Sequence, residues 1–403
     1  MSSAAESRDS ALIEKAAKFY FEYKQAAGAL SLDDFLKLLE GVSEEIREDV
    51  RAQIRNGLLL MALDEALKAV EKALGERAAY RKFEVEFGKS VEGALHVPLT
   101  VIVHPSGLYA YTTTKNTALP PSYKVFGALI RELYRLGMSY KEYGYFGTEE
   151  KVKSKAEELL KYFELFPEGE IREPQRYDPE WLKRALEAYY IYKGAEFGYR
   201  RRPEASARRY KILLWKLYEA FTLFLLLRVL IRKGFRFRFE KEGVLSVFDH
   251  GSIFRIFINK PLEGFEVIQS VDKADGKLIE SLKGRPDISI NEKRIALECK
   301  YSTSMSYLTA GRFKVLAYIY EFDLVTGVLV SPQPELNIAD DEEKSEEANG
   351  TKALYKLASD SSGLLELSLK DGNKMFVMIL DPLEDDKELE DRMEKFVDRL
   401  IIY

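Results

Sequence analysis

The feature that most constrains the fold is a change of pattern at Gly234. Before it, apolar residues at helical spacing run over residues 181–233, with a break near residues 198–203. After it come six short runs rich in β-branched and aromatic residues: FRFRFE, VLSVF, SIFRIFIN, FEVIQS, PDISI and RIALECK. A helix over 307–322, three further strands (DLVTGVLVS, GLLELSLK and KMFVMIL) and a helix over 384–400 follow. This succession predicts an α+β domain with a mixed central β-sheet flanked by helices.

The rest of the chain divides into further regions, so we expect a multidomain protein. Residues 1–80 carry apolar residues at three- and four-residue spacing and are predicted to be helical. Residues 81–166 contain the alternating run KFEVEF, the run GLYAYTTT and two helical stretches, and we expect this β-containing region to bind DNA or a partner. The polar segment 167–179 holds three prolines and is the predicted linker to a domain at 180–403. The acidic segment 335–350 is predicted to be a loop.

Composition limits the classes of function. The formal net charge of −5 excludes a globally basic nucleic-acid-binding protein, although it leaves room for a local basic groove. A single cysteine, Cys299, excludes an intrachain disulfide and a cysteine-based zinc site, and it fits a reducing, cytoplasmic compartment. The start of the chain lacks the pattern of a signal peptide. The most apolar run, residues 220–227, is too short to cross a bilayer, so no membrane contact is expected.

The residues best suited to chemistry lie in the stretch GRPDISINEKRIALECKYS, residues 284–302. Asn291-Glu292-Lys293 separates two β-rich runs, and pairing of these runs as a hairpin would place Asp287 beside Glu298. Glu298 and Lys300 lie on one face of their strand, about 6–7 Å apart, because side chains alternate faces. Cys299 then points into the core. The sequence therefore predicts two carboxylates and one ammonium in a small patch.

Such a patch suits a divalent cation. Two neighbouring carboxylates repel each other unless a cation lies between them, and hard oxygen ligands favour Mg²⁺ or Mn²⁺. A metal held there would lower the pKa of a bound water and neutralise charge on a phosphodiester. The Lys300 ammonium could orient that water and stabilise the developing negative charge.

The spacing of these residues resembles the PD-(D/E)XK nuclease superfamily. Pro286-Asp287 is followed, after ten residues, by Glu298-Cys299-Lys300. Upstream, Glu219 lies on an apolar helical segment just before the first strand and resembles the first-motif glutamate of the superfamily. The resemblance covers about residues 205–331 and implies a restriction-endonuclease-like domain.

What this resemblance implies is a Mg²⁺-dependent endonuclease or exonuclease acting on DNA. Asp287 and Glu298 would hold the metal, with the carbonyl of Cys299 as a third ligand. Lys300 would assist the attacking water, and Glu219 would support the metal or its water shell. Lys216, three residues before Glu219, offers the alternative of an ion pair without a catalytic role.

Downstream of the strands, GRFKVLAYIYEF resembles the helix that reads Q-x-x-x-Y in RecB-like members of the superfamily. Tyr318 matches the tyrosine, but Lys314 stands where glutamine would be, which points to a phosphate contact in place of a contact with the metal water or base. Tyr318 could equally be a core aromatic residue, and Lys314 could belong to a solvated helix face.

A narrower resemblance is to the nuclease subunit of McrBC-type restriction systems and its McrC-like relatives. It rests on residues 93–100 (GALHVPLT), Leu217-Tyr218-Glu219 and Lys300-Tyr301, and would extend over most of the chain. It implies the cleavage subunit of a restriction or defence system, with an NTP-driven translocase as partner because this chain has no nucleotide-binding loop of its own.

Basic residues at two places are candidates for binding the nucleic-acid backbone. Arg285 and Lys283 flank Asp287, and Arg201 and Arg202 belong to a cluster of arginines with tyrosines nearby. For both groups a solvated surface is the competing interpretation.

Three other readings of the whole patch stay open. It could be a surface hairpin with a salt bridge. The chain could be a non-catalytic DNA-binding or scaffold protein on a nuclease fold, or an RNA-directed nuclease of the same superfamily.

Overall fold

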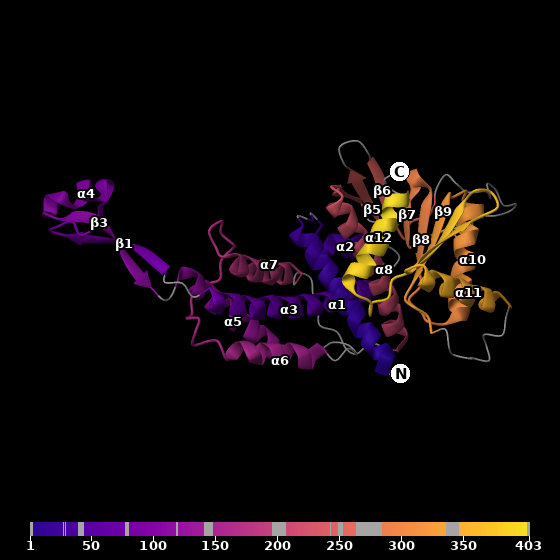
Figure 1. Ribbon diagram of the computed structural model, residues 1–403, viewed down its shortest axis with the longest axis horizontal. Helices are drawn as coiled ribbons and strands as arrows, with labels where there is room; N and C mark the ends of the chain where they lie inside the picture. Colours follow the sequence, from indigo (N-terminus) through magenta and orange to yellow (C-terminus); the bar gives the residue numbers. More distant parts are fainter. Residues whose placement is uncertain are drawn as a thin grey trace. The chain divides into compact units, whose positions relative to one another are not determined.

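The computed structural model describes residues 3–26, 28, 30–38, 44–76, 80–117, 120–140, 148–195, 207–241, 243–248, 253–262, 284–335 and 346–400 (Figure 1). The chain forms two compact units. The first comprises Met1–Leu58, Glu142–Thr148 and Ile191–Tyr403, and the second comprises Leu59–Lys141 and Glu149–Tyr190. In the described part of the chain, no helix is long and apolar enough to cross a membrane.

The first unit is built on an eight-stranded mixed sheet. The strand order is β10-β11-β9-β8-β7-β6-β5-β4. Strand β9 pairs in parallel with both β8 and β11, and every other pair is antiparallel. The bounds are β4 (Arg236–Lys241), β5 (Val244–Phe248), β6 (Ile253–Ile258), β7 (Ile288–Ile290), β8 (Ile295–Cys299), β9 (Thr326–Ser331), β10 (Leu364–Ser368) and β11 (Lys374–Ile379). The α+β class and the mixed sheet flanked by helices are confirmed.

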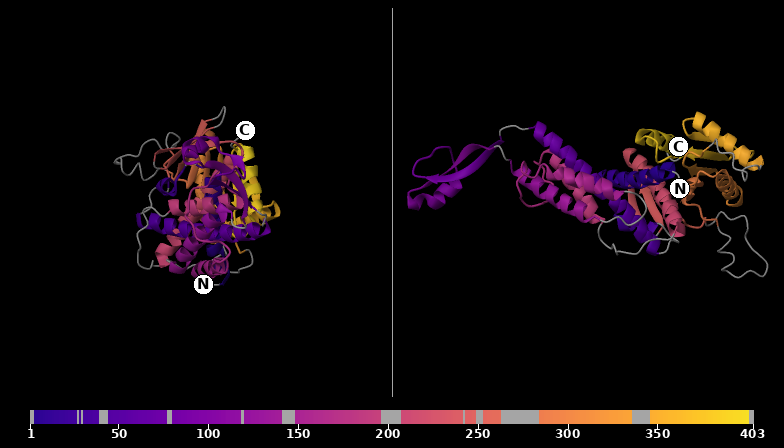
Figure 2. Two further views of the ribbon diagram at one scale, coloured as in Figure 1. Left: turned by 90° about the vertical axis from the view of Figure 1, so that its left-hand side faces the viewer. Right: turned by 90° about the horizontal axis from the view of Figure 1, so that it is seen from below.

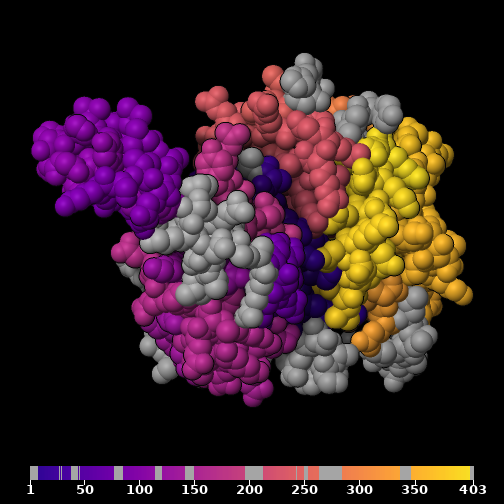
Figure 3. Space-filling model, turned by 60° about the vertical axis from the view of Figure 1, so that its left-hand side comes forward, coloured from indigo at the N-terminus to yellow at the C-terminus, as the bar shows by residue number. Residues whose placement is uncertain are grey.

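Helices cover both faces of this sheet (Figures 1 and 2). Helices α10 (Met305–Glu321) and α11 (Glu346–Asp360) pack on one face, while α8 (Ala207–Arg232) and α12 (Asp386–Leu400) lie over the other. Figure 3 shows α12, in yellow, at the surface beside the red residues of α8 and the strands that follow it.

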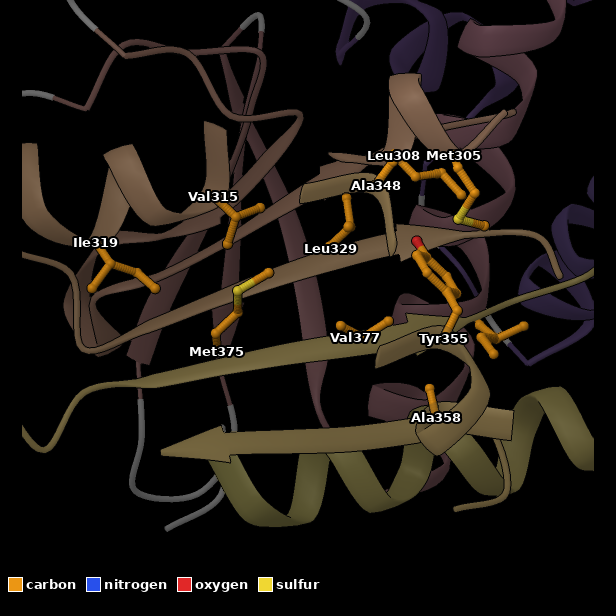
Figure 4. Close-up of a cluster of buried hydrophobic side chains, with 11 residues drawn as sticks. Met305, Leu308, Val315, Ile319, Leu329, Ala348, Tyr355, Ala358, Met375 and Val377 are labelled. Carbon is orange, nitrogen blue, oxygen red and sulfur yellow. The ribbon is translucent and has the colours of Figure 1, made fainter. Parts of the chain in front are cut away.

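The core between the sheet and the α10–α11 layer forms because side chains alternate between the two faces of each strand. Met375, Val377 and Ile379 of β11 all face this layer, because residues two apart lie on the same side of a strand. All three belong to one buried cluster with Val315 and Ile319 of α10 and Tyr355 of α11. Figure 4 shows Met375 and Val377 on the same side of the sheet as these residues. A β carbon on Gly327 of β9 would lie only 2.5 Å from Val315 Cγ1, so the glycine lets α10 approach the sheet closely.

The N-terminal helices of the chain complete the first unit. Helix α1 (Ser3–Gln25) packs along α8, where the rings of Phe19 and Phe221 stack with centroids 5.5 Å apart. The short helix α2 (Leu32–Leu38) adds Phe35, whose ring meets the ring of Phe224 of α8 edge-on, with centroids 4.3 Å apart. The apolar run of α8 is thus buried by an aromatic layer from residues far away in the sequence.

The second unit combines helices with a small sheet. It contains the C-terminal part of α3 (Glu44–Gly75), α5 (Pro121–Ser139), α6 (Thr148–Leu160) and most of α7 (Glu180–Gly194). Strands β1 (Tyr80–Gly88), β3 (Tyr109–Thr117) and β2 (Ala94–Leu95) form an antiparallel sheet in the order β1-β3-β2, accompanied by α4 (Val97–Val103). The alternating pattern of KFEVEF therefore belongs to a strand, as predicted.

One secondary-structure expectation is wrong. The predicted loop at 335–350 is contradicted at residues 346–350, which begin α11 (Glu346–Asp360). Residues 336–345 lie outside the described residues. The first turn of α11 is acidic, which favours a helix N-terminus, and Ala348, Thr351 and Tyr355 form its buried face. The acidic composition concealed this apolar spacing. The run FEVIQS and the break near 198–203 lie outside the described residues. The division at 80, 166 and 180 remains a prediction.

Candidate active site

The β7–β8 hairpin brings two carboxylates together. Ile288 pairs with Leu297 in the antiparallel register, so the next position outward sets Asp287 beside Glu298. The turn is a short 3₁₀ segment, Asn291–Lys293, closed by Arg294 in a left-handed conformation with φ of 55°. Both carboxylates are buried, with exposed fractions of 9% for Asp287 and 1% for Glu298.

Glu298 is held by three donors. The ammonium groups of Lys300 and Lys314 lie 2.6 and 2.7 Å from its Oε1, and the Tyr318 hydroxyl lies 3.3 Å from its Oε2. Lys314 and Tyr318 come from the same face of α10, because residues four apart on a helix are neighbours. Tyr318 is buried and also donates to the carbonyl oxygen of Arg285 at 2.8 Å, which ties the loop before Asp287 to this helix.

The position of Lys300 depends on a gap in α10. A β carbon on Gly311 would lie 3.0 Å from Lys300 Cγ and 3.0 Å from Leu329 Cδ1, so a larger residue there would press the lysine stem and the leucine by a few tenths of an ångström. Burial lowers the pKa of Lys300, but the charge and hydrogen bond of Glu298 outweigh that effect and leave the pKa raised. Lys300 is therefore protonated at neutral pH.

Glu219 lies in a second polar group at the same end of the sheet. Lys216 Nζ contacts both of its carboxylate oxygens, at 2.8 and 2.7 Å, and Asn259 Nδ2 donates to Oε2 at 3.1 Å. Asn259 follows β6 with a φ of 53°, and its backbone N–H donates to the carbonyl oxygen of Asp287 at 3.0 Å. Asn259 thus connects Glu219 to the Asp287 backbone, and the ion pair of Glu219 with Lys216 that the sequence left open is present.

Asp287 has a different environment from the other two carboxylates. Its Oδ2 accepts a hydrogen bond from the backbone N–H of Cys299 at 2.6 Å. Within the described residues no lysine or arginine forms an ion pair with it. Burial raises the pKa of Asp287 well above its usual range, and the negative charges of Glu298 and Glu219 raise it further. A buried carboxylate without a cation is costly when ionised.

This arrangement fits a hydrated Mg²⁺ ion more closely than a closed metal cage. In the described part of the chain, no three histidine, cysteine, aspartate or glutamate side chains are grouped closely enough to hold a metal. Mg²⁺ is commonly bound by one or two carboxylates and completes its shell with waters and phosphate oxygens. Asp287 forms no ion pair with a described lysine or arginine and lies beside Glu298, so these two carboxylates are the residues that could hold such an ion.

The remaining candidate residues are placed as follows. The Arg285 side chain is exposed. Cys299 is buried, and burial raises the pKa of its thiol, so the thiol is an inert core group. Lys283, Arg201 and Arg202 lie outside the described residues.

Sequence reasoning missed Asn259 and Gly311. The dipeptide Asn259-Lys260 before a proline was a usable signal for a strand end with a left-handed residue. The glycine four residues after Tyr307 in the middle of an apolar helix was a signal for close packing.

Comparisons with known proteins do not assign this chain to a family. No protein-family model matches the sequence, and no curated protein matches it. One solved structure that aligns with the chain is the refined half-complex from a tetradecameric assembly of Thermococcus gammatolerans McrB AAA+ hexamers with bound McrC. That alignment covers 92% of this chain and 76% of that chain at 12% identity, with a TM-score of 0.33. The likeness is distant in both measures.

The raised pKa of Asp287 predicts a pH-dependent loss of stability. Between the ordinary value of 3.8 and the raised pKa, the folded state binds more protons than the unfolded state, so the free energy of unfolding falls as pH rises. We expect Asp287→Asn to become increasingly more stable than the wild type as pH rises above about 4. Urea unfolding across pH 4–8 measures the difference.

A divalent cation should stabilise the wild type but not Asp287→Asn, and so reverse their order of stability. Mn²⁺ at a hundred times its Kd would stabilise the wild type by about 2.7 kcal/mol and leave Asp287→Asn unchanged. Glu292→Gln, which removes a partly exposed carboxylate of the same hairpin, is the matched control and should keep the full metal response. Equal metal responses in wild type and Asp287→Asn would contradict the site.

Proposed function

We propose that the unit containing residues 191–403 is a Mg²⁺-dependent nuclease that hydrolyses DNA phosphodiester bonds. The observation that carries the proposal is the buried Asp287 carboxylate, which forms no ion pair with a described lysine or arginine and lies beside Glu298, whose carboxylate contacts the Lys300 ammonium. The spacing of these residues, which resembles the PD-(D/E)XK superfamily, supports the same conclusion.

In this proposal Asp287 and Glu298, with the backbone carbonyl of Cys299, would hold the metal. When bound, the metal would supply a water of lowered pKa and neutralise charge on the phosphate. Lys300 stays protonated and therefore acts as a hydrogen-bond donor and a positive charge, not as a base. It can orient the attacking water and stabilise the negative charge that develops on the phosphate oxygens.

The surrounding residues keep these groups in place. Tyr318 donates to Glu298 and to the Arg285 carbonyl, and thereby fixes both sides of the hairpin against α10. Lys314 shares Glu298 Oε1 with Lys300 and is a second ammonium within reach of a bound phosphate. Glu219, whose oxygens are bonded to Lys216 and Asn259, is suited to supporting a water shell. The exposed Arg285 is suited to a backbone phosphate.

Cleavage assays with plasmid DNA, linear DNA and RNA, in Mg²⁺, Mn²⁺ or EDTA, test the proposal. We expect metal-dependent cleavage of DNA that Asp287→Ala abolishes and that Lys300→Ala slows by about 10²–10³-fold, the usual effect of removing a group that stabilises the transition state. Glu292→Gln should cleave like the wild type.

Cleavage that persists in Asp287→Ala would contradict the assigned site. A folded protein that binds DNA but cleaves neither DNA nor RNA with any metal would favour the non-catalytic scaffold. Preferential cleavage of RNA would favour the RNA-directed alternative.

A second prediction concerns the gap at Gly311. Gly311→Ala puts a methyl group 3.0 Å from Lys300 Cγ, and we expect the lysine stem to adjust and carry the ammonium away from its position. We expect kcat to fall by about 10- to 100-fold with little change in KM, because sub-ångström to ångström misplacement of a catalytic group has effects of this size.

Gly350→Ala is the matched control for this change. It is also a helical glycine, and a β carbon there would lie 3.7 Å from a nitrogen of Arg312, which is an ordinary contact distance. It should leave kcat unchanged and stabilise the fold slightly. Equal kcat values for Gly311→Ala and the wild type would show that the catalytic placement of Lys300 does not depend on a glycine at position 311.

We further propose that the small β module, defined by β1, β2, β3 and α4, binds a protein partner and not DNA. Val101 and Ile102 of α4 are 69% and 71% exposed, and Val97, Leu95 and Phe87 are also exposed. An apolar surface suits a protein interface, whereas a DNA backbone requires clustered cations. The resemblance to McrC-like proteins supports an NTP-driven translocase as this partner and a role as the cleavage subunit of a restriction or defence system.

Co-expression with a candidate AAA+ partner and size-exclusion chromatography of the mixture test the module. We expect a complex with the wild type that the double variant Val101→Asp, Ile102→Asp loses, because two charges would have to be buried. Tyr177→Asp, which alters a side chain that is 91% exposed elsewhere, should retain the complex. A complex that survives the double variant would place the interface outside the module.

A further inference from the structure

Two aromatic side chains stack next to the candidate active site. The rings of Trp215 in α8 and Tyr307 in α10 have centroids 6.0 Å apart and planes inclined by 14°. Both side chains are partly exposed to solvent. The other tryptophan of the chain, Trp181, is buried. We call these two residues the aromatic pair.

One ring of the aromatic pair, Tyr307, lies beside the Lys300 ammonium of the site. Lys300 Nζ lies 5.2 Å from the centroid of the Tyr307 ring and at the same time contacts Glu298. Lys216, which follows Trp215 directly, contacts Glu219. A phosphate held by the Lys300 ammonium would therefore have a partly exposed aromatic surface beside it.

Nucleobases stack on such surfaces only when they are unpaired. A base inside a duplex has both of its faces covered by neighbouring base pairs, whereas a base in a single strand can place a face on an aromatic side chain. Stacking is tolerant of sequence because every base has a π face. Close ammonium groups complete the site, since single-strand grooves combine aromatic rings with cations along the backbone.

We propose that the aromatic pair binds an unpaired nucleobase of the nucleotide next to the phosphate at Lys300. The favoured substrate is then a single strand, a frayed end or a flap, and not an intact duplex. This inference rests on the proposed nuclease function for its biological meaning, but the binding site itself can be tested without cleavage.

Binding in EDTA isolates the aromatic pair from catalysis. Fluorescence anisotropy would compare three labelled probes of equal length: a deoxythymidine strand, a strand with sugars and phosphates but no bases, and a blunt duplex. We expect Trp215→Leu and Tyr307→Leu each to weaken binding of the thymidine strand by about tenfold, the usual loss of one stacking contact. Binding of the baseless strand and the duplex should not change.

Tyr320→Leu is the matched control, because Tyr320 is an exposed tyrosine on the same helix. It lies thirteen residues further along, about 20 Å from Tyr307 at the rise of an α-helix. It should bind all three probes like the wild type. An equal loss for the thymidine and baseless strands, or no loss for either, would overturn the proposal.

Tryptophan fluorescence gives a second readout should a leucine variant fold poorly. In Trp181→Phe the remaining emission comes from Trp215, and stacking of a base should quench it on addition of the thymidine strand and not of the baseless strand. Unchanged emission at saturating thymidine strand would overturn the proposal.

The outcomes for this site and for the nuclease function remain separate. Base-dependent binding in EDTA without cleavage in Mg²⁺ would retain the aromatic pair and remove the nuclease function. Metal-dependent cleavage without base-dependent binding would support the nuclease function and contradict the base-binding role of the aromatic pair.

Discussion

The rest of the site depends on one constraint: the carboxylate of Glu298, on β8, is buried in the interior. An ionised carboxylate that is almost fully buried is stable only when cations and hydrogen-bond donors surround it. Lys300 can supply one cation from the same chain segment, but Lys314 and Tyr318 must come from a helix packed against the sheet. The close approach of α10 to β8 and β9 is therefore part of the site.

Two glycines make that approach possible. Gly327 on β9 leaves space for Val315 and Ile319, and Gly311 on α10 leaves space for Lys300 and Leu329. Each glycine in a helix or strand interior costs about 0.5–1 kcal/mol relative to alanine. In this protein the cost is offset by the burial of the α10–α11 layer on the sheet and by the ion pairs that α10 makes with Glu298.

The short-range part of the site could be predicted from the sequence. The alternation of side chains and the turn at Asn291-Glu292-Lys293 are enough to set Asp287 beside Glu298, and the structure has that register. The mixed sheet follows in the same way from strands of the right length separated by turn residues and a helix. These features depend on residues close together in the chain, where geometry leaves few choices.

Contacts between distant segments could not be predicted, since no local pattern encodes them. Tyr301, directly after Lys300, donates to Asp9 of α1 at 2.6 Å across 292 positions of sequence. Asn259 joins Glu219 to the Asp287 backbone only because the middle of α8, the end of β6 and the start of β7 lie at one place. Helix α11 was missed for a different reason, because acidic residues at its start resembled a loop while its buried residues formed a helical face.

Under the proposed function, a chain with a net charge of −5 must attract a phosphodiester through the local charges of the site. Three carboxylates, those of Glu219, Asp287 and Glu298, face three ammonium groups, those of Lys216, Lys300 and Lys314, so the ionised site is close to neutral. Its pairing is uneven, because Glu298 forms ion pairs with two lysines and Asp287 forms none with a described lysine or arginine.

A proton and a divalent cation therefore compete for Asp287. Without metal, the raised pKa of Asp287 favours the protonated acid and removes one negative charge. A bound divalent cation would displace that proton and leave the site with about two net positive charges, since metal binding to a carboxylate requires its ionised form. The attraction for a phosphate is then local and metal-dependent, and it needs no basic surface over the rest of the protein.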